Sequence, residues 1–181
     1  MILRPQNETD SDAVAGLLAR AFGPGHPARA VWNLRLTHPV EGLALVCELA
    51  DRLVGSLRFW QISLAGQPQL LLGPLAVEPD LQGAGIGQSL VKQGLGIASQ
   101  SGYQAVLVSG EAHYYSHFDF VPAPANLRWP GPIEAGRLQI KELKPGYLAS
   151  LPKGPLAILP DPEPAPKLEV DFLTSAQSAR S

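Results

Sequence analysis

The sequence predicts an α/β fold of the α+β type, in which helices flank a mixed, mostly antiparallel central sheet. Three observations indicate this class. Residues 43–60 have the pattern of a strand hairpin, residues 70–108 have that of a strand, a helix and a strand, and 45% of the 181 residues are hydrophobic. A strand, helix and strand in succession close as a right-handed parallel crossover, so one parallel pair should join the antiparallel strands.

The segment before residue 40 predicts two helices. Asp10 or Ser11 can cap a helix that runs to about Phe22, because apolar residues recur there at helical spacing on one face. Glycines and prolines at residues 23–27 end this helix. A second short helix is expected over residues 28–37.

Three strands should follow. Residues 43–49 are an apolar run and residues 53–60 alternate, so the turn-like residues between them predict an antiparallel hairpin. Residues 70–77 are apolar almost throughout, which favours a central strand covered on both faces. Because proline cannot donate a ladder hydrogen bond, Gly73-Pro74 predicts a bulge at which this ladder splays.

The chain beyond residue 85 predicts two helices and two strands. Apolar residues from 86 to 98 share one face of a helix, which Gly102 can end in the left-handed conformation. Residues 105–108 predict a buried strand, residues 114–118 a short helix, and residues 137–143 a late strand.

We expect a single domain over residues 1–150, followed by a proline-rich extended arm or disordered tail over residues 151–181. The one cysteine, Cys47, cannot form an internal disulfide and should be a small buried strand residue. No stretch approaches the roughly 18 apolar residues of a membrane span, and no export signal is visible. The formal charge of -2 gives no electrostatic reason to bind nucleic acid. The sequence therefore predicts a cytoplasmic protein without nucleic-acid or membrane partners.

A glycine-rich turn, Gln82-Gly83-Ala84-Gly85-Ile86-Gly87, joins the central strand to the following helix. Such a turn lets backbone N–H groups converge on an anion at the positive end of a helix. A Walker loop would need Gly-Lys-Ser or Gly-Lys-Thr, but Gln88 follows Gly87. The dinucleotide fingerprint would need glycine at position 88 and an acidic residue about 20 residues later, and both are absent. These differences argue against nucleotide hydrolysis and nicotinamide binding.

The turn has the pattern Q/R-x-x-G-x-G/A, and Val77-x-Pro79 introduces it at the end of the bulged strand. Residues 115–120, Tyr-Ser-His-Phe-Asp-Phe, match a late Y-x-x-h-G-F element in which h is apolar. Together these motifs resemble the GNAT superfamily of acyl-CoA-dependent N-acyltransferases, and most of all its YhbS-like subgroup of predicted acetyltransferases. The resemblance covers roughly residues 1–123. It departs from the family at Asp119, which replaces a glycine but is a residue type that tolerates the left-handed conformation.

The resemblance implies an N-acyltransferase that moves an acetyl group from acetyl-CoA to a primary amine by direct attack in a ternary complex. It also implies that N–H groups of the loop hold the pyrophosphate of coenzyme A and that the splayed strand pairs with the pantetheine arm, while the N–H of Val77 stabilises the oxyanion. The cofactor-binding residues would then be Leu75, Ala76, Val77, Gln82, Gly83, Ala84, Gly85, Ile86, Gly87 and Gln88. The alternative is a non-catalytic acyl-CoA-binding module, which would need neither a general acid nor a base.

Two residues are candidates for proton transfer. Tyr115 matches the family's general-acid tyrosine by its spacing from Phe120. An alkyl ammonium with a pKa of about 10.4 must lose a proton before it attacks, so a base or a water chain is also needed. Glu111 follows a strand that should border the cleft and is the candidate base, with His113 as its rival, whereas Glu78 is expected at the surface.

No metal site is expected. His113 and His117 would share a helix face, but Tyr114 stands at the glutamate position of the H-E-x-x-H zinc motif and no third ligand is evident. The acceptor stays open between small-molecule amines and protein amines. The stretch after Pro122 has no counterpart in the minimal fold, and it could shape the acceptor side, cover the sheet or form a homodimer.

Overall fold

The computed structural model describes residues 1–23, 34 and 38–161, so the predicted helix over residues 28–37 lies almost wholly outside the described residues. In the described part, nine strands form one sheet in the order β1-β2-β3-β4-β5-β8-β6, with β9 beside β3 and β7 beside β9. The elements are β1 (Ile2–Pro5), α1 (Ser11–Phe22), β2 (Ala44–Leu49), β3 (Arg52–Leu64), β4 (Gln67–Val77), α2 (Ile86–Gln100), β5 (Ala105–Ser109), α3 (Ala112–Ser116), β6 (Val121–Pro122), β7 (Leu127–Arg128), β8 (Leu138–Glu142), α4 (Tyr147–Ser150) and β9 (Leu156–Pro160).

The predicted mixed, mostly antiparallel sheet is confirmed. β2 and β3 form the predicted antiparallel hairpin, and its turn holds Ala50 and Asp51 at φ values of 49° and 59°, as a two-residue turn requires. β4 lies centrally between β3 and β5, and its pairing with β5 is parallel, as the crossover through α2 predicts. Among the described helices, none is long and apolar enough to cross a bilayer.

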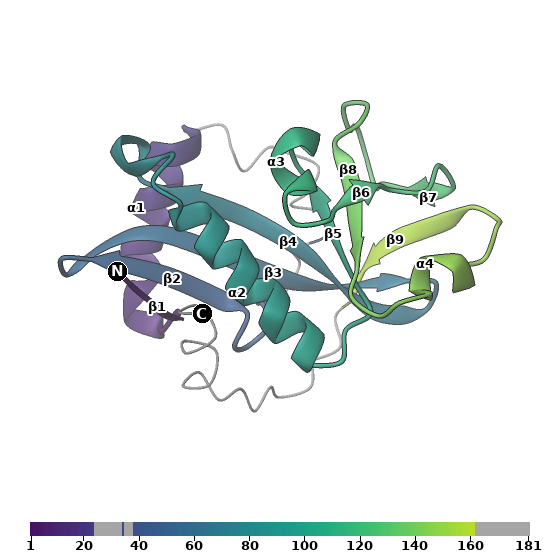
Figure 1. Ribbon diagram of the computed structural model, residues 1–181, viewed down its shortest axis with the longest axis horizontal. Helices are drawn as coiled ribbons and strands as arrows, with labels where there is room; N and C mark the ends of the chain where they lie inside the picture. The colour runs from purple at the N-terminus through teal and green to yellow at the C-terminus, as the bar shows by residue number, and fades with distance from the viewer. Residues whose placement is uncertain (24–33, 35–37, 162–181) are drawn as a thin grey trace.

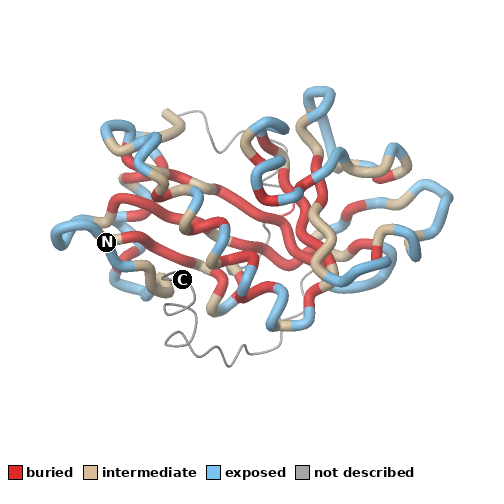
Figure 2. Tube along the Cα trace, in the orientation of Figure 1, coloured by how far each residue is buried: buried red, intermediate tan, exposed pale blue. Residues whose placement is uncertain are grey.

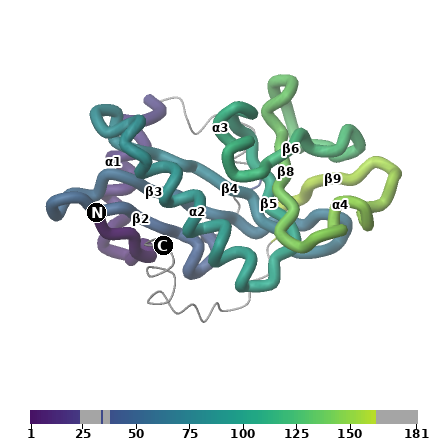
Figure 3. The backbone as a smooth tube through the Cα atoms, viewed as in Figure 1, coloured from purple at the N-terminus to yellow at the C-terminus, as the bar shows by residue number. Residues whose placement is uncertain are grey.

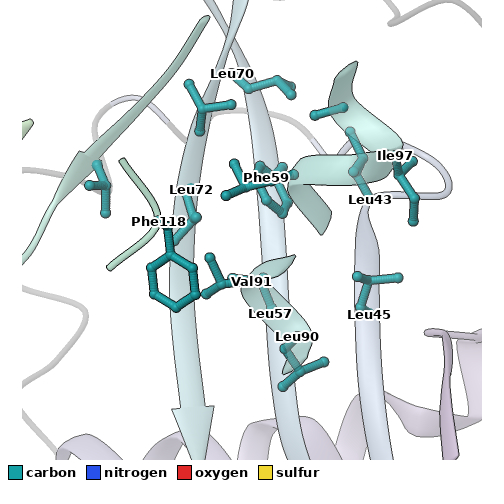
Figure 4. Packing of buried hydrophobic residues seen from close by; sticks show 14 of the residues in the cluster. Leu43, Leu45, Leu57, Phe59, Leu70, Leu72, Leu90, Val91, Ile97 and Phe118 are labelled. Atoms are coloured by element: carbon teal, nitrogen blue, oxygen red, sulfur yellow. The ribbon is translucent and has the colours of Figure 1, made fainter. Parts of the chain in front are cut away.

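The two long helices cover opposite faces of the sheet. α2 lies across one face of β2, β3 and β4, and α1 lies behind the sheet on the other face (Figure 1). The strands between them are buried along most of their length (Figure 2). The α2 side buries Leu45, Leu57, Phe59, Leu72, Leu90 and Val91 (Figure 4). The α1 side buries Val14, Leu17, Leu18, Val46 and Ala76.

Local backbone predictions after α2 are also confirmed. Gly102 adopts φ 82° beyond the end of α2, and Asp119 adopts φ 61°. Cys47 is fully buried in β2, which confirms the prediction of a small buried strand residue. The short helix was placed too late, because α3 spans Ala112–Ser116 rather than residues 114–118.

In the C-terminal part of the sheet, β5 and β8 were predicted, but β6, β7, α4 and β9 were not. β5, β8, β6 and β9 gather with α4 at the end of the molecule remote from the β2–β3 turn (Figure 3). β9, which lies within the predicted arm, pairs antiparallel with Ile62–Leu64 of β3, a strand that runs four residues past its predicted end at Trp60. The domain boundary near residue 150 stays a prediction.

Candidate functional site

An opening lies between β4 and β5 because their pairing is short. Leu70–Leu72 of β4 pair with Val106–Val108 of β5, and no later residue of β4 pairs with β5 among the described residues. β4 nevertheless continues to Val77 as the partner of β3. The sheet therefore splays after Leu72, as the proline in this strand predicted.

The splay begins at a bulge. Leu57 pairs with Leu75 and Phe59 with Leu72, so the two residues Gly73-Pro74 lie opposite the single residue between them on β3. Trp60 fixes the bulge, because its indole N–H donates a hydrogen bond of 2.7 Å to the carbonyl oxygen of Gly73. The indole thus binds a carbonyl group in the disrupted part of the ladder.

The open edge of β4 presents backbone groups of two of the three strand residues predicted to bind the cofactor. The N–H of Glu78 donates to the carbonyl oxygen of Val54 at 2.9 Å, so it points toward β3. Backbone groups alternate in direction along a strand, so those of Val77 and Leu75 point away from β3, into the opening. Ala76 pairs with Ser56, and its methyl group packs under α1.

The glycine loop adds N–H groups to this edge. Gly83 and Gly85 adopt φ values of 86° and 83°, which glycine reaches without strain. Gly85 caps α2, and the first hydrogen bond of that helix runs from the N–H of Ser89 to the carbonyl oxygen of Gly85. The N–H groups of residues 86–88 therefore have no acceptor within the helix and lie at its positive end.

A cavity of about 280 Å³ lies over the loop and the adjoining part of β4. Two of its lining residues, Leu81 and Tyr114, were not predicted. Ala76 and Ala84 were predicted but are not among the lining residues. The predicted residues that the structure brings together around it are Leu75, Val77, Gln82, Gly83, Gly85, Ile86, Gly87 and Gln88.

Tyr114 is the polar side chain that α3 contributes to the cavity. Its ring packs edge-on against Tyr115 and Phe118, with centroids 5.1 Å and 5.5 Å away. A Cβ atom at Gly87 would lie 2.9 Å from the Tyr114 hydroxyl, so this hydroxyl stands directly over the loop. Burial raises the pKa of Tyr114, which keeps it a neutral donor. The family motif, by its spacing from Phe120, selects the neighbouring residue Tyr115. The sequence signal for Tyr114 is only that it is a second tyrosine directly before Tyr115.

Tyr115 lies on the β5 side of the opening and not among the residues that line the cavity. It is 8% exposed and contacts Phe120, with ring centroids 5.5 Å apart. Its ring also covers Gly110, where a Cβ atom would come within 2.2 Å of Cε2. Gly110 directly follows β5, so the ring is held beside the end of that strand.

Glu111 also follows β5, but its carboxylate faces solvent. The side chain is 75% exposed and forms an ion pair with Arg137. His113 lies on α3 with its ring centroid 5.2 Å from that of His117, whose Nδ1 lies 2.8 Å from the His113 carbonyl oxygen. No group of three potential metal ligands occurs among the described residues.

The prediction that Glu78 lies at the surface is wrong. Glu78 is 5% exposed, and Arg20 of α1 donates to its Oε1 at 2.7 Å while Arg52 lies 4.0 Å away. An acidic residue beside Pro79 has the local pattern of an exposed turn. The partner that makes its burial tolerable is 58 residues away in sequence, so local pattern could not reveal it.

Comparisons with known proteins agree with this geometry. Residues 41–122 match the acetyltransferase (GNAT) domain family. The uncharacterized N-acetyltransferase YhbS of Escherichia coli is 29% identical over 136 residues, which cover 72% of this chain and 81% of YhbS. The uncharacterized N-acetyltransferase YjhQ of Escherichia coli is 30% identical over 131 residues, which cover 70% of this chain and 72% of YjhQ.

Solved structures show the same fold. The crystal structure of Escherichia coli YhbS in complex with CoA matches with a TM-score of 0.72 and 27% identity, over 86% of this chain and 88% of that one. A GNAT family acetyltransferase from Brucella melitensis in complex with acetyl-CoA matches with a TM-score of 0.65 and 23% identity, over 86% and 94% of the two chains. The chain therefore belongs to the GNAT family of N-acetyltransferases.

Proposed function

We propose that this protein transfers an acetyl group from acetyl-CoA to a primary amine by direct attack in a ternary complex. One observation carries the proposal: the cavity over the N-terminus of α2 is continuous with the open edge of β4, because Leu75 and Val77 belong to both. An anion-binding helix terminus followed by unpaired strand groups suits a ligand with a pyrophosphate and an amide-bearing arm.

The loop and the strand have separate roles in this proposal. N–H groups of Gly83 and of residues 85–88 hold the pyrophosphate, and the Tyr114 hydroxyl, which stands over Gly87, donates a further hydrogen bond to it. Backbone groups of Leu75 and Val77 pair with the pantetheine arm as a neighbouring strand would. No lysine or arginine is among the described residues that line the cavity, so the helix terminus supplies positive potential there. Support comes from the CoA bound in the crystal structure of the similar protein YhbS.

The chemistry needs proton transfers at two atoms. The amine nitrogen bonds to the carbonyl carbon and gives up a proton, which Glu111 or the rival base His113 accepts directly or through water. The N–H of Val77 donates to the developing oxyanion. The carbon–sulfur bond then breaks, and the leaving thiolate takes a proton from Tyr115. The spacing of Tyr115 from Phe120 supports this role, and its ring lies against Gly110 at the end of β5.

Calorimetric titration with coenzyme A tests the proposal through two matched glycines of α2. Gly85 and Gly102 lie at opposite ends of the helix with φ values of 83° and 82°, and neither has an atom within 4 Å of an added Cβ. Valine at either position should cost about 1–2 kcal/mol of backbone strain. We expect Gly85→Val to weaken coenzyme A binding by about tenfold or more, and Gly102→Val to leave it unchanged. Equal affinities in both variants would show that the loop does not hold the cofactor.

A further inference from the structure

The side chains of β4 change faces at the bulge. Leu70 and Leu72, which precede the bulge, belong to the apolar cluster under α2. Leu75 and Val77, which follow it, pack against the same cluster, while Ala76 packs under α1. Side chains alternate along a regular strand, so the even-numbered residues would otherwise stay on the α2 face. The extra residue in the bulge therefore exchanges the two faces of the strand beyond it.

This exchange decides which side chains line the cavity over the loop. Leu75 and Val77 line it, and a Cβ atom at Gly87 would lie 3.6 Å from each of their side chains. Without the exchange, Glu78, which directly follows β4, would face α2 instead. Its carboxylate would then repel an anion at the helix terminus. In the bulged strand this carboxylate lies on the α1 side, where it forms an ion pair with Arg20.

The exchange applies to the backbone of β4 as well. Backbone groups also alternate along a strand, so a shift by one residue reverses the direction of every group beyond it. The bulge thus turns the N–H and carbonyl groups of Leu75 and Val77 away from β3 and into the opening. In an unbulged strand those of Ala76 would take this place, and Leu75 and Val77 would bond to β3.

Trp60 holds the bulge through a buried hydrogen bond. Its indole N–H donates to the carbonyl oxygen of Gly73 at 2.7 Å, and the side chain is 6% exposed. Trp60 itself pairs with Leu71, in the regular part of the ladder, so its side chain ties the bulge to a well-paired position. A buried carbonyl that loses its donor destabilises the conformation that buries it. Loss of the indole N–H should therefore release the bulge.

We propose that Trp60 is a positioning residue for the cofactor, which holds the one-residue shift that presents Leu75 and Val77 to the pantetheine arm. This inference rests on the proposed binding of acetyl-CoA. It adds a residue that is not among the described residues lining the cavity and that acts through the Gly73 carbonyl. The glycine loop does not depend on this contact, because its N–H groups are fixed by the start of α2.

Calorimetry with two ligands tests this division. Coenzyme A uses both the loop and the strand, whereas adenosine 3′-phosphate 5′-diphosphate keeps the pyrophosphate and lacks the pantetheine arm. Trp60→Phe keeps an aromatic ring and removes the N–H. We expect it to weaken binding of coenzyme A by about tenfold and to leave the affinity for the nucleotide unchanged. Gly85→Val should weaken the binding of both ligands, because it alters the loop.

Tyr103→Phe is the matched control, because it also removes a buried hydrogen bond to β3. The Tyr103 hydroxyl donates to Oε1 of Gln61 at 3.0 Å, and Gln61 pairs with Leu70, before the bulge. This variant should bind both ligands as the wild-type protein does. A second replacement, 3-benzothienylalanine at position 60, keeps the shape of the indole and has sulfur in place of the N–H. It should reproduce the effect of Trp60→Phe, and it decides the matter if phenylalanine prevents folding.

The two ligands separate the failure of this inference from that of the proposed function. If the wild-type protein binds coenzyme A and the variants at position 60 bind it equally well, Trp60 has no positioning role and the proposed function stands. If these variants lose affinity for both ligands to the same extent, the effect is a general structural one and the inference is wrong. If the wild-type protein does not bind coenzyme A, the proposed function fails and the role of Trp60 fails with it.

Discussion

Tyr114 and Tyr115 are neighbours in sequence but face different surroundings. Tyr114 lines the cavity over the loop, and Tyr115 packs beside the end of β5. The family motif predicted a role for Tyr115 alone, because a motif gives spacing and not the direction of a side chain. The short helix α3 turns consecutive residues by about 100°, so one tyrosine meets the loop and the other meets the core.

Removing the hydroxyl should therefore affect catalysis at Tyr115 and coenzyme A binding at Tyr114. Tyr115→Phe should lower kcat by about a hundredfold with coenzyme A affinity unchanged, as expected for a general acid. Tyr114→Phe should weaken coenzyme A binding several-fold, about 1 kcal/mol for one lost hydrogen bond, with kcat little changed. Calorimetry and steady-state kinetics on both variants distinguish the roles. An unchanged kcat in Tyr115→Phe would contradict the general-acid assignment and favour a packing role.

At the scale of elements, β1 and α1 are joined by a charged contact that local pattern did not predict. Arg4 of β1 donates to both carboxylate oxygens of Asp10, at 2.7 Å and 2.8 Å, and Asp10 directly precedes α1. Asp10 or Ser11 was predicted to cap α1, and Asp10 takes the N-cap position, although its side chain makes no hydrogen bond to the helix. Its second role depends on the chain folding back onto β1, so sequence distance conceals it.

This contact makes stability depend on pH in acid. The hydrogen bonds from Arg4 lower the pKa of Asp10 below its ordinary value of 3.8. The unfolded chain therefore binds more protons near that pH, and the stabilisation, complete above it, is lost as the pH falls through the lower folded pKa. Asp10→Asn should reduce the free energy of unfolding by about 1–3 kcal/mol at neutral pH. Urea unfolding should show this difference shrinking below about pH 4, and a constant difference would contradict the assignment.

Across the whole molecule, the features that depend on local sequence are those that could be predicted from it. The central strand, its bulge, the loop and α2 were predicted because each depends on local rules of proline, glycine and apolar periodicity. The burial of Glu78, the indole contact of Trp60 and the strand β9 were not, because each depends on a partner far away in sequence. Local sequence therefore predicts where the loop lies in the chain, whereas contacts made by distant elements cannot be predicted from it.

The strand β9 offers a test at this scale. It pairs with Ile62–Leu64 of β3 and buries Ile158, which is 1% exposed. A chain that ends at Asp161 should keep this strand, and a chain that ends at Gly154 should lose it, together with about 2 kcal/mol from Ile158 alone. Thermal unfolding should give the shorter chain the lower midpoint. Equal midpoints would show that β9 adds nothing to the stability of the sheet.

The pairing between β4 and β5 is short, so the two strands are joined at one end and separate toward the other. The two strands are joined over three residue pairs at Leu70–Leu72, and β9 crosses onto β3 at the same end, so the halves are fastened there and diverge beyond it. A small change in the angle between β4 and β5 alters the gap at Val77 more than it alters the pairing at Leu70–Leu72, because Val77 lies farther from the joined end. The buried side chain of Leu71 lies at this joined end, remote from the loop, so the core holds the two strands together where the opening begins.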